Sequence, residues 1–104
     1  MPEKVYEAIE LARKTGQIKK GVNEVTKAIE KGTAKLVAAA KDVSPPEIIM
    51  HLPLLCKEKG IVYAEVPSKE ELGAAAGLPV ATGAVAITKE GESKDTIKEI
   101  SKSE

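Results

Sequence analysis

The residues best suited to chemistry lie in one segment, residues 19–32, which reads KKGVNEVTKAIEKG. Asn23 can cap an expected helix by accepting a hydrogen bond from a first-turn amide, and Glu24 lies where the helix dipole favours an anion. Lys27 follows one turn later on the same side of the helix. A carboxylate repels phosphates but accepts hydrogen bonds from the base edge of a guanine, whereas lysines hold phosphates. The segment therefore combines base-reading and phosphate-holding groups, the two parts of a nucleic-acid contact.

These residues also fit an ordinary helix start. Many helices carry an Asn cap, an acid in the first turn and a lysine further along, with no function beyond stability. Taken alone, this segment favours the structural interpretation, so other parts of the chain must decide.

Charge is distributed unevenly along a chain whose net charge is zero. Residues 13–41 carry eight basic and two acidic side chains, a net charge of +6, whereas residues 1–12 carry −2 and residues 42–104 carry −4. A local basic zone in a neutral chain fits a compact, specific RNA contact better than indiscriminate polyanion binding, which usually needs a strongly positive domain. The uneven charge distribution, taken alone, is explained equally well by solvated helix and loop faces.

Aromatic side chains are almost absent, because the chain has Tyr6 and Tyr63 but no Phe or Trp. Domains that bind single strands by stacking bases on aromatic platforms need several rings on one face. Any RNA must therefore be recognised by hydrogen bonds, phosphate contacts and aliphatic packing.

The length and composition of the chain argue against several other classes of protein. A chain of 104 residues fits one domain, and its apolar runs are far shorter than the roughly 20 residues of a membrane-spanning helix. We expect no signal segment at the start of the chain. Cys56 is the only cysteine and His51 the only histidine, so we expect no internal disulfide and no metal site. We expect a cytoplasmic protein without a membrane contact.

The N-terminal half predicts helices alternating with strands. We expect a helix over residues 2–15, ended by Gly16, and a short basic loop, with a short strand over residues 17–20 as the alternative. A helix over residues 23–31 ends at Gly32, and the apolar run 36–40 has the length of a strand. The next helix is expected to begin within residues 42–47, because Ser44 and Glu47 form a capping box around Pro45. It should be kinked at Pro53 and closed by Gly60.

The C-terminal half continues this alternation. We expect a strand over residues 61–66, a second capping box from Ser68 to Glu71, and a helix through residues 72–76 that ends at Gly77. An apolar loop (78–82), a strand (84–88), a turn (90–92) and a last helix from Ser93 follow. Strands separated by helices predict a three-layer α/β/α sandwich with a small mixed sheet.

Catalytic constellations are not apparent. His51 has no Ser, Cys or acid at a spacing that suggests a partner, and a single helical histidine is more often structural. The glycines at 73, 77 and 83 lack the Gly-Lys-Ser/Thr ending of a phosphate loop. We therefore expect no enzyme activity, no catalytic residue and no cofactor.

Three segments in order resemble the kink-turn-binding ribosomal protein family, the archaeal L-seven-Ae proteins and their relatives. They are GVNEVTKAIEKGTAKLV (21–37), KDVSPPEIIMHLPLLCKEKGIVY (41–63) and VPSKEELGAAAG (66–77), so the resemblance covers nearly the whole chain. It implies that residues 1–104 form a single domain that binds kink-turns, which are RNA duplexes bent sharply at a short bulge flanked by sheared guanine-adenine pairs.

The resemblance also implies roles for particular residues. Residues matching Asn23 and Glu24 contact the guanines of the sheared pairs, and the one matching Lys27 assists. Other matching residues approach the RNA backbone, or they surround and cover the flipped-out bulge nucleotide. The full candidate set is Lys19, Lys20, Gly21, Asn23, Glu24, Lys27, Ile48, Lys69, Leu78, Pro79, Val80 and Ala81. Within it, Lys20 and Gly21 match the backbone contacts, Ile48 and Lys69 surround the bulge nucleotide, and residues 78–81 cover it; Lys19 belongs to the basic segment.

Similarity to the archaeal branch of the family implies several RNA partners: ribosomal RNA of the large subunit, the guide RNAs of box C/D and H/ACA particles, and ribonuclease P RNA. Core proteins assembled on the same RNA are further candidate partners of an expected monomer. The ribosomal thirty-e paralogs match less well, because the Asn-Glu pair and the HLPLLC run favour the archaeal branch. A protein-interaction module, with its apolar loop and acidic helices docking a partner, is the alternative class, and a small-molecule enzyme ranks last.

Overall fold

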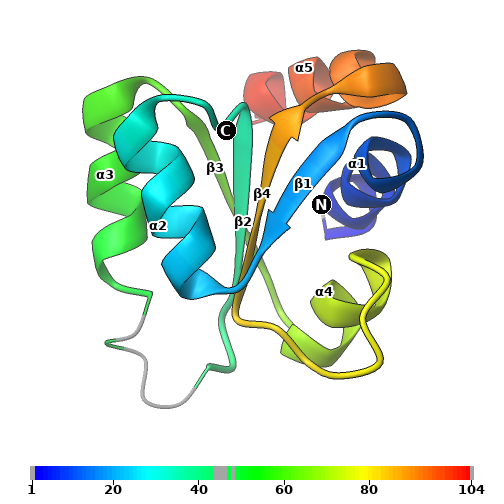
Figure 1. Ribbon diagram of the computed structural model, residues 1–104, viewed down its shortest axis with the longest axis horizontal. Coiled ribbons are helices and arrows are strands. Elements are labelled where there is room, and N and C mark those ends of the chain that lie inside the picture. Colours follow the sequence, from blue (N-terminus) through cyan, green and yellow to red (C-terminus); the bar gives the residue numbers. More distant parts are fainter. Residues whose placement is uncertain (1, 44–46, 48, 104) are drawn as a thin grey trace.

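The computed structural model describes residues 2–43, 47 and 49–103. Four strands and five α-helices, with a short 3-10 helix before the last, follow one another along the described chain (Figure 1). In order they are α1 (Pro2–Thr15), β1 (Gln17–Lys20), α2 (Val22–Lys31), β2 (Leu36–Ala40), α3 (His51–Lys59), β3 (Val62–Val66), α4 (Lys69–Ala75), β4 (Ala84–Lys89), the 3-10 helix (Gly91–Ser93) and α5 (Lys94–Ser103).

The four strands form one mixed sheet in the order β1-β4-β2-β3. Strands β2 and β3 are parallel, with α3 in the crossover between them, and β4 runs antiparallel to both β1 and β2. All five residues of β2 are buried, as expected for a strand whose two faces are both covered by helices.

Helices cover both faces of this sheet. Helices α1, α4 and α5 lie on one face, and α2 and α3 lie on the other (Figure 1). Alternate residues of β2 divide between the two cores: Leu36 and Ala38 pack toward α1, whereas Val37 and Ala39 pack toward α2 and α3. The predicted three-layer α/β/α sandwich with a small mixed sheet is confirmed.

Residues 17–20 are a strand, not the basic loop that we preferred. Three of the four β1 side chains are exposed and only Ile18 packs into the core, so the segment lacks the alternation that marks a half-buried strand. Its regularity comes from antiparallel pairing with β4, from Gln17 opposite Lys89 to Lys20 opposite Val85. That pairing brings together segments almost seventy residues apart in the chain.

Helix α3 differs most from the prediction. It begins at His51 rather than within residues 42–47, and the proposed capping box falls partly on Ser44 and Pro45, which lie outside the described residues. Pro53 is the third helical residue, where backbone amides have no partner inside the helix. Proline there removes no helical hydrogen bond, so the kink predicted for an interior proline was wrong. The remaining boundaries agree with the prediction within one or two residues.

Candidate nucleic-acid interface

A single glycine joins β1 to α2. The amide of Gly21 donates to the carbonyl oxygen of Ala84 at 2.9 Å, and its own carbonyl accepts from the amide of Val25 at 2.9 Å. Its backbone angles are φ 95° and ψ 145°, a conformation that is essentially confined to glycine. Gly21 thus lets the chain leave the sheet and start the helix within one residue.

Asn23 does not cap this helix, contrary to the prediction. The cap position is Gly21, which makes no side-chain cap, and Asn23 is the second helical residue. Asn23 and Glu24 are both exposed. The first-turn amides of α2 therefore keep their positive potential for a ligand, and the Asn23 amide group is not used as a cap.

Glu24 is loosely paired with Lys27. The Glu24 Oε1 to Lys27 Nζ distance is 4.0 Å, and the two side chains are 54% and 65% exposed. Exposed pairs of this kind contribute little to stability. Glu24 can therefore exchange Lys27 for a hydrogen-bond donor of a ligand at small cost.

Two surface hollows meet at Glu24. The first, of about 600 Å³, lies at the tip of α2 and is lined by Lys20, Gly21, Val22, Asn23, Glu24 and His51. The second, of about 360 Å³, runs between α2 and the ends of β1 and β4 and is lined by Gln17, Lys19, Glu24, Lys27, Ala28, Lys31, Thr33, Thr88 and Lys89. We call the first the tip hollow and the second the basic groove.

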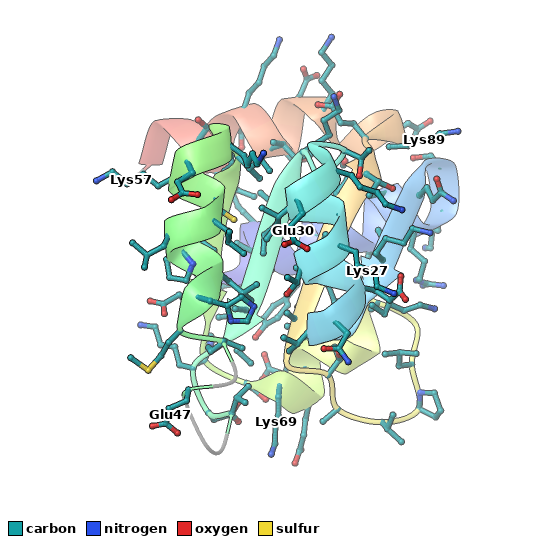
Figure 2. The ribbon with its side chains drawn as sticks, turned by 60° about the vertical axis from the view of Figure 1, so that its left-hand side comes forward. Lys27, Glu30, Glu47, Lys57, Lys69 and Lys89 are labelled. Carbon is teal, nitrogen blue, oxygen red and sulfur yellow. The ribbon has the colours of Figure 1, made fainter. Side chains whose placement is uncertain are left out.

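The basic groove contains lysines that sequence reasoning missed. Figure 2 shows Lys27 and Lys89 on the same side of α2, and Glu30 on the side facing α3. Lys31 follows Lys27 by four residues, so helical spacing was a usable signal for it. Lys89 is brought in by the pairing of β4 with β1, for which the sequence carries no local signal.

Helix α4 and the loop after it form a third group of candidate residues. Lys69 is the first residue of α4, and residues 78–81 leave the end of the helix and fold back along it. Leu78 is partly buried, whereas Val80 is 65% exposed. The amide of Thr82 donates to the carbonyl oxygen of Lys69 at 3.1 Å. A hollow of about 440 Å³ is lined by Glu70, Ala74, Leu78, Pro79, Val80 and Ala81.

The candidate residues gather at one end of the sheet. The starts of α2 and α4 and the loop before β4 all lie at the lower end of the molecule in Figure 1. Gly83, at the end of that loop, lies so near the start of α2 that a Cβ atom added to it would be 3.4 Å from Val22 Cγ2. The tip hollow and the α4 loop therefore belong to one surface, while Lys19 and Lys27 extend it into the basic groove. Ile48 lies outside the described residues.

Asp42 holds the start of α4 in place. Its Oδ1 accepts from the amide of Lys69 at 2.8 Å, while Ser68 Oγ accepts from the amide of Glu71 at 3.2 Å, as the second predicted capping box requires. We expect Asp42→Ala to lower the free energy of unfolding by about 1 kcal/mol, the usual value of a helix cap. Urea denaturation measures this, with Asp95→Ala, which changes an exposed aspartate of α5, as the control. A loss no larger than that of the control would contradict the capping role.

The described residues contain neither a metal-binding cluster nor a membrane-spanning helix. Among them, no three His, Cys, Asp or Glu side chains lie close enough to hold a metal ion. No helix in the described part of the chain has the length and apolarity needed to cross a bilayer.

Comparison with known proteins gives the family. The model of the ribosomal protein L7Ae/L30e/S12e/Gadd45 family matches residues 3–97. A solved structure of a 15.5 kD RNA-binding protein from Giardia lamblia is similar, with a TM-score of 0.91 and 34% sequence identity, over 97% of this chain and 84% of that one. The chain belongs to the ribosomal protein L7Ae/L30e/S12e/Gadd45 family.

Proposed function

We propose that this protein binds RNA through the start of α2 and that its ligands are kink-turns. The observation that carries the proposal is the exposed Asn23-Glu24 pair on a helix start without a side-chain cap, flanked by the lysines of the basic groove. The likeness to an RNA-binding protein of Giardia lamblia supports it.

Base recognition is assigned to the tip hollow. The Glu24 carboxylate accepts from the amino group on a guanine edge, and the Asn23 amide both donates and accepts. A free carboxylate disfavours phosphate at the same position. Guanines that present their edges at a sharp bend, as in sheared guanine-adenine pairs, therefore suit this hollow better than the backbone of a regular duplex.

Phosphate contacts are assigned to the lysines on either side. Lys20 lines the tip hollow, and Lys19, Lys27, Lys31 and Lys89 line the basic groove. The distance from Asn23 to Lys31 along α2 is about 12 Å, at 1.5 Å per residue. That length covers a few base pairs of an A-form stem, so the groove suits the backbone of the stem beside the bend.

The α4 loop is assigned to the extruded nucleotide. Pro79, Val80 and Ala81 are exposed aliphatic residues beside the start of α4. They offer apolar surface to a base that has left the helical stack, and Lys69 adds a cation. We also assign Ile48 to this contact, because the resemblance to the family implies that this residue surrounds the bulge nucleotide.

The mechanism is a shift in an RNA equilibrium. The RNA flexes between extended and kinked forms, and the protein stabilises the kinked form by its differential affinity for it. No bond in the RNA is made or broken. We infer that ribosomal RNA, box C/D and H/ACA guide RNAs and ribonuclease P RNA qualify as ligands wherever they contain this bend.

One observation favours protein docking as a second function. Met50, the N-cap residue of α3, and Leu54, four residues later within the helix, are 63% and 67% exposed. Core proteins assembled on the same RNA are the candidate partners. If docking were the only function, Met50→Ser with Leu54→Ser would abolish partner binding and no RNA would bind the parent protein.

A gel-shift titration tests the proposal. The RNAs are a hairpin with a three-nucleotide bulge flanked by guanine-adenine pairs and the same hairpin without the bulge. We expect a shift with the bulged RNA at protein concentrations that leave the control hairpin free. Equal binding of both RNAs would reject the kink-turn specificity, and binding of neither would reject the function.

Salt dependence tests the phosphate contacts. We expect Lys27→Gln and Lys31→Gln each to flatten the plot of log affinity against log salt by roughly 0.7 to 0.9 for each lost contact. Lys57→Gln is the matched control, because Lys57 is an exposed lysine on α3, away from Lys27 (Figure 2). Slopes equal to the parent's in both groove variants would contradict phosphate binding there.

A further inference from the structure

His51 lies in the tip hollow, although its sequence context predicts only a structural role. It is the first residue of α3 and lines the hollow with Lys20, Asn23 and Glu24. Its Nε2 is 2.9 Å from the Oγ1 atom of Thr26 on α2. The side chain thus joins the start of one helix to the first turns of another.

The direction of this hydrogen bond follows from counting protons. Thr26 Oγ1 donates to the carbonyl oxygen of Val22 at 2.8 Å, and a hydroxyl group has one proton to donate. For both bonds to form, Thr26 accepts from His51, which assigns the proton of the neutral imidazole to Nε2. The result is a chain from His51 Nε2–H through the Thr26 hydroxyl to the Val22 carbonyl, in which each bond polarises the next.

The first turn of α2 is anchored by the packing of Val22 and Val25 in the core and by the hydrogen bond from the Gly21 amide to Ala84. No side chain caps it, and uncapped helix ends open readily. Among the described residues, Thr26 to His51 is the side-chain hydrogen bond that connects α2 to another helix. The last acceptor in this series of hydrogen bonds is the carbonyl oxygen of Val22, which directly precedes Asn23 and Glu24.

We propose that His51 is a positioning residue for RNA recognition, which acts through Thr26 and Val22 to fix the turn that presents Asn23 and Glu24. The inference rests on the proposed RNA binding. It differs from a purely structural role because it couples His51 to the base-reading residues and leaves the lysines of the basic groove unaffected.

Three substitutions test the chain of bonds. His51→Leu removes the donor, Thr26→Val removes the hydroxyl, and His51→Gln keeps an N–H donor at a similar reach. We expect the first two to weaken binding of the bulged RNA about 2- to 10-fold, the range of one net hydrogen bond, and His51→Gln to restore most of it. Affinities are measured at a temperature where circular dichroism shows every variant folded.

Double-mutant cycles separate positioning from stability. We expect Glu24→Ala to cost less in the His51→Leu protein than in the parent, because the carboxylate is already misplaced, and Lys31→Ala to cost the same in both. Additive costs for Glu24 and His51 would overturn the positioning role. So would a lower melting temperature for His51→Leu with an unchanged RNA affinity.

The single histidine permits a direct spectroscopic check. The ¹⁵N signals of the His51 ring, recorded at alkaline pH, should show the Nε2-protonated form in the parent and a changed tautomer balance in Thr26→Val. The Nδ1-protonated form in the parent would overturn the assignment. If the parent fails to bind the bulged RNA, the proposed function fails; if it binds and only Glu24→Ala weakens it, this inference alone fails.

Discussion

Glu24→Ala is expected to weaken binding of a kink-turn RNA about 5- to 150-fold, the equivalent of the 1 to 3 kcal/mol of a good base contact. The carboxylate lies between the tip hollow and the basic groove, and its loose pairing with Lys27 leaves its oxygens open to guanine N–H groups. Removing a negative charge from a basic surface should improve phosphate binding. A loss of affinity therefore identifies Glu24 as an acceptor for a base.

Glu30→Ala is the matched control for this prediction. Glu30 is an exposed glutamate on the same helix, but it lies on the side that faces α3 (Figure 2). Isothermal titration calorimetry of both variants should show a loss for Glu24→Ala and parent-like affinity for Glu30→Ala. Equal or higher affinity for the Glu24 variant would reject the base-reading role.

Gly73→Ala is expected to lower the free energy of unfolding by about 1 to 3 kcal/mol, the usual cost of overpacking. Gly73 is buried in α4, and a Cβ atom there would collide with the carbonyl oxygen of Val80 and lie 3.1 Å from the Ala81 Cα. Both are backbone atoms, so no rotamer change relieves the contact. The 78–81 loop must move away from α4, and RNA affinity should fall with it.

Gly60→Ala controls for the loss of a glycine as such. Gly60 ends α3 with φ 68°, but a Cβ atom there would meet nothing within 4 Å. The Gly60→Ala substitution should lower the free energy of unfolding, because alanine is strained at this positive φ. It should leave the RNA affinity unchanged. If Gly73→Ala binds RNA as tightly as the parent, the loop does not contribute to the site.

Local sequence signals predicted the elements that depend on local physics. Helix α1 has the expected bounds because apolar residues recur at helical spacing from Val5 to Ala12 and Gly16 follows. The Ser68 cap of α4 also formed, since its two partners are three residues apart in the chain. Strand β2 was recognisable because burial on both faces makes it apolar throughout.

Elements that depend on distant partners were not predictable in this way. Strand β1 carries exposed polar side chains and owes its structure to β4. The start of α3 was misjudged because the capping-box pattern around Pro45 indicated an earlier start, whereas the helix begins at His51, with Pro53 in its first turn. For β1, tertiary context outweighed the local pattern.

The residues of the candidate site also differ in whether local spacing or distant packing brings them together. Asn23, Glu24 and Lys27 were placed together because one helix start fixes their spacing. The capping role of Asn23 was wrong because Gly21 already provides the turn into the helix. Lys89 in the basic groove and the contact of His51 with Thr26 depend on packing between elements far apart in the chain, which residue spacing does not reveal.

End-to-end fluorescence transfer on a bulged RNA tests the central claim most directly. The RNA carries a dye on each of its two stems. The parent protein should raise the energy transfer between the dyes to a saturating plateau, because it binds the bent form of the RNA and stabilises it. Glu24→Ala should need a higher concentration to reach the same plateau, and the duplex without the bulge should show no rise. Unchanged transfer on the bulged RNA, or the same rise on both RNAs, would contradict the claim that the start of α2 reads bases at a kink.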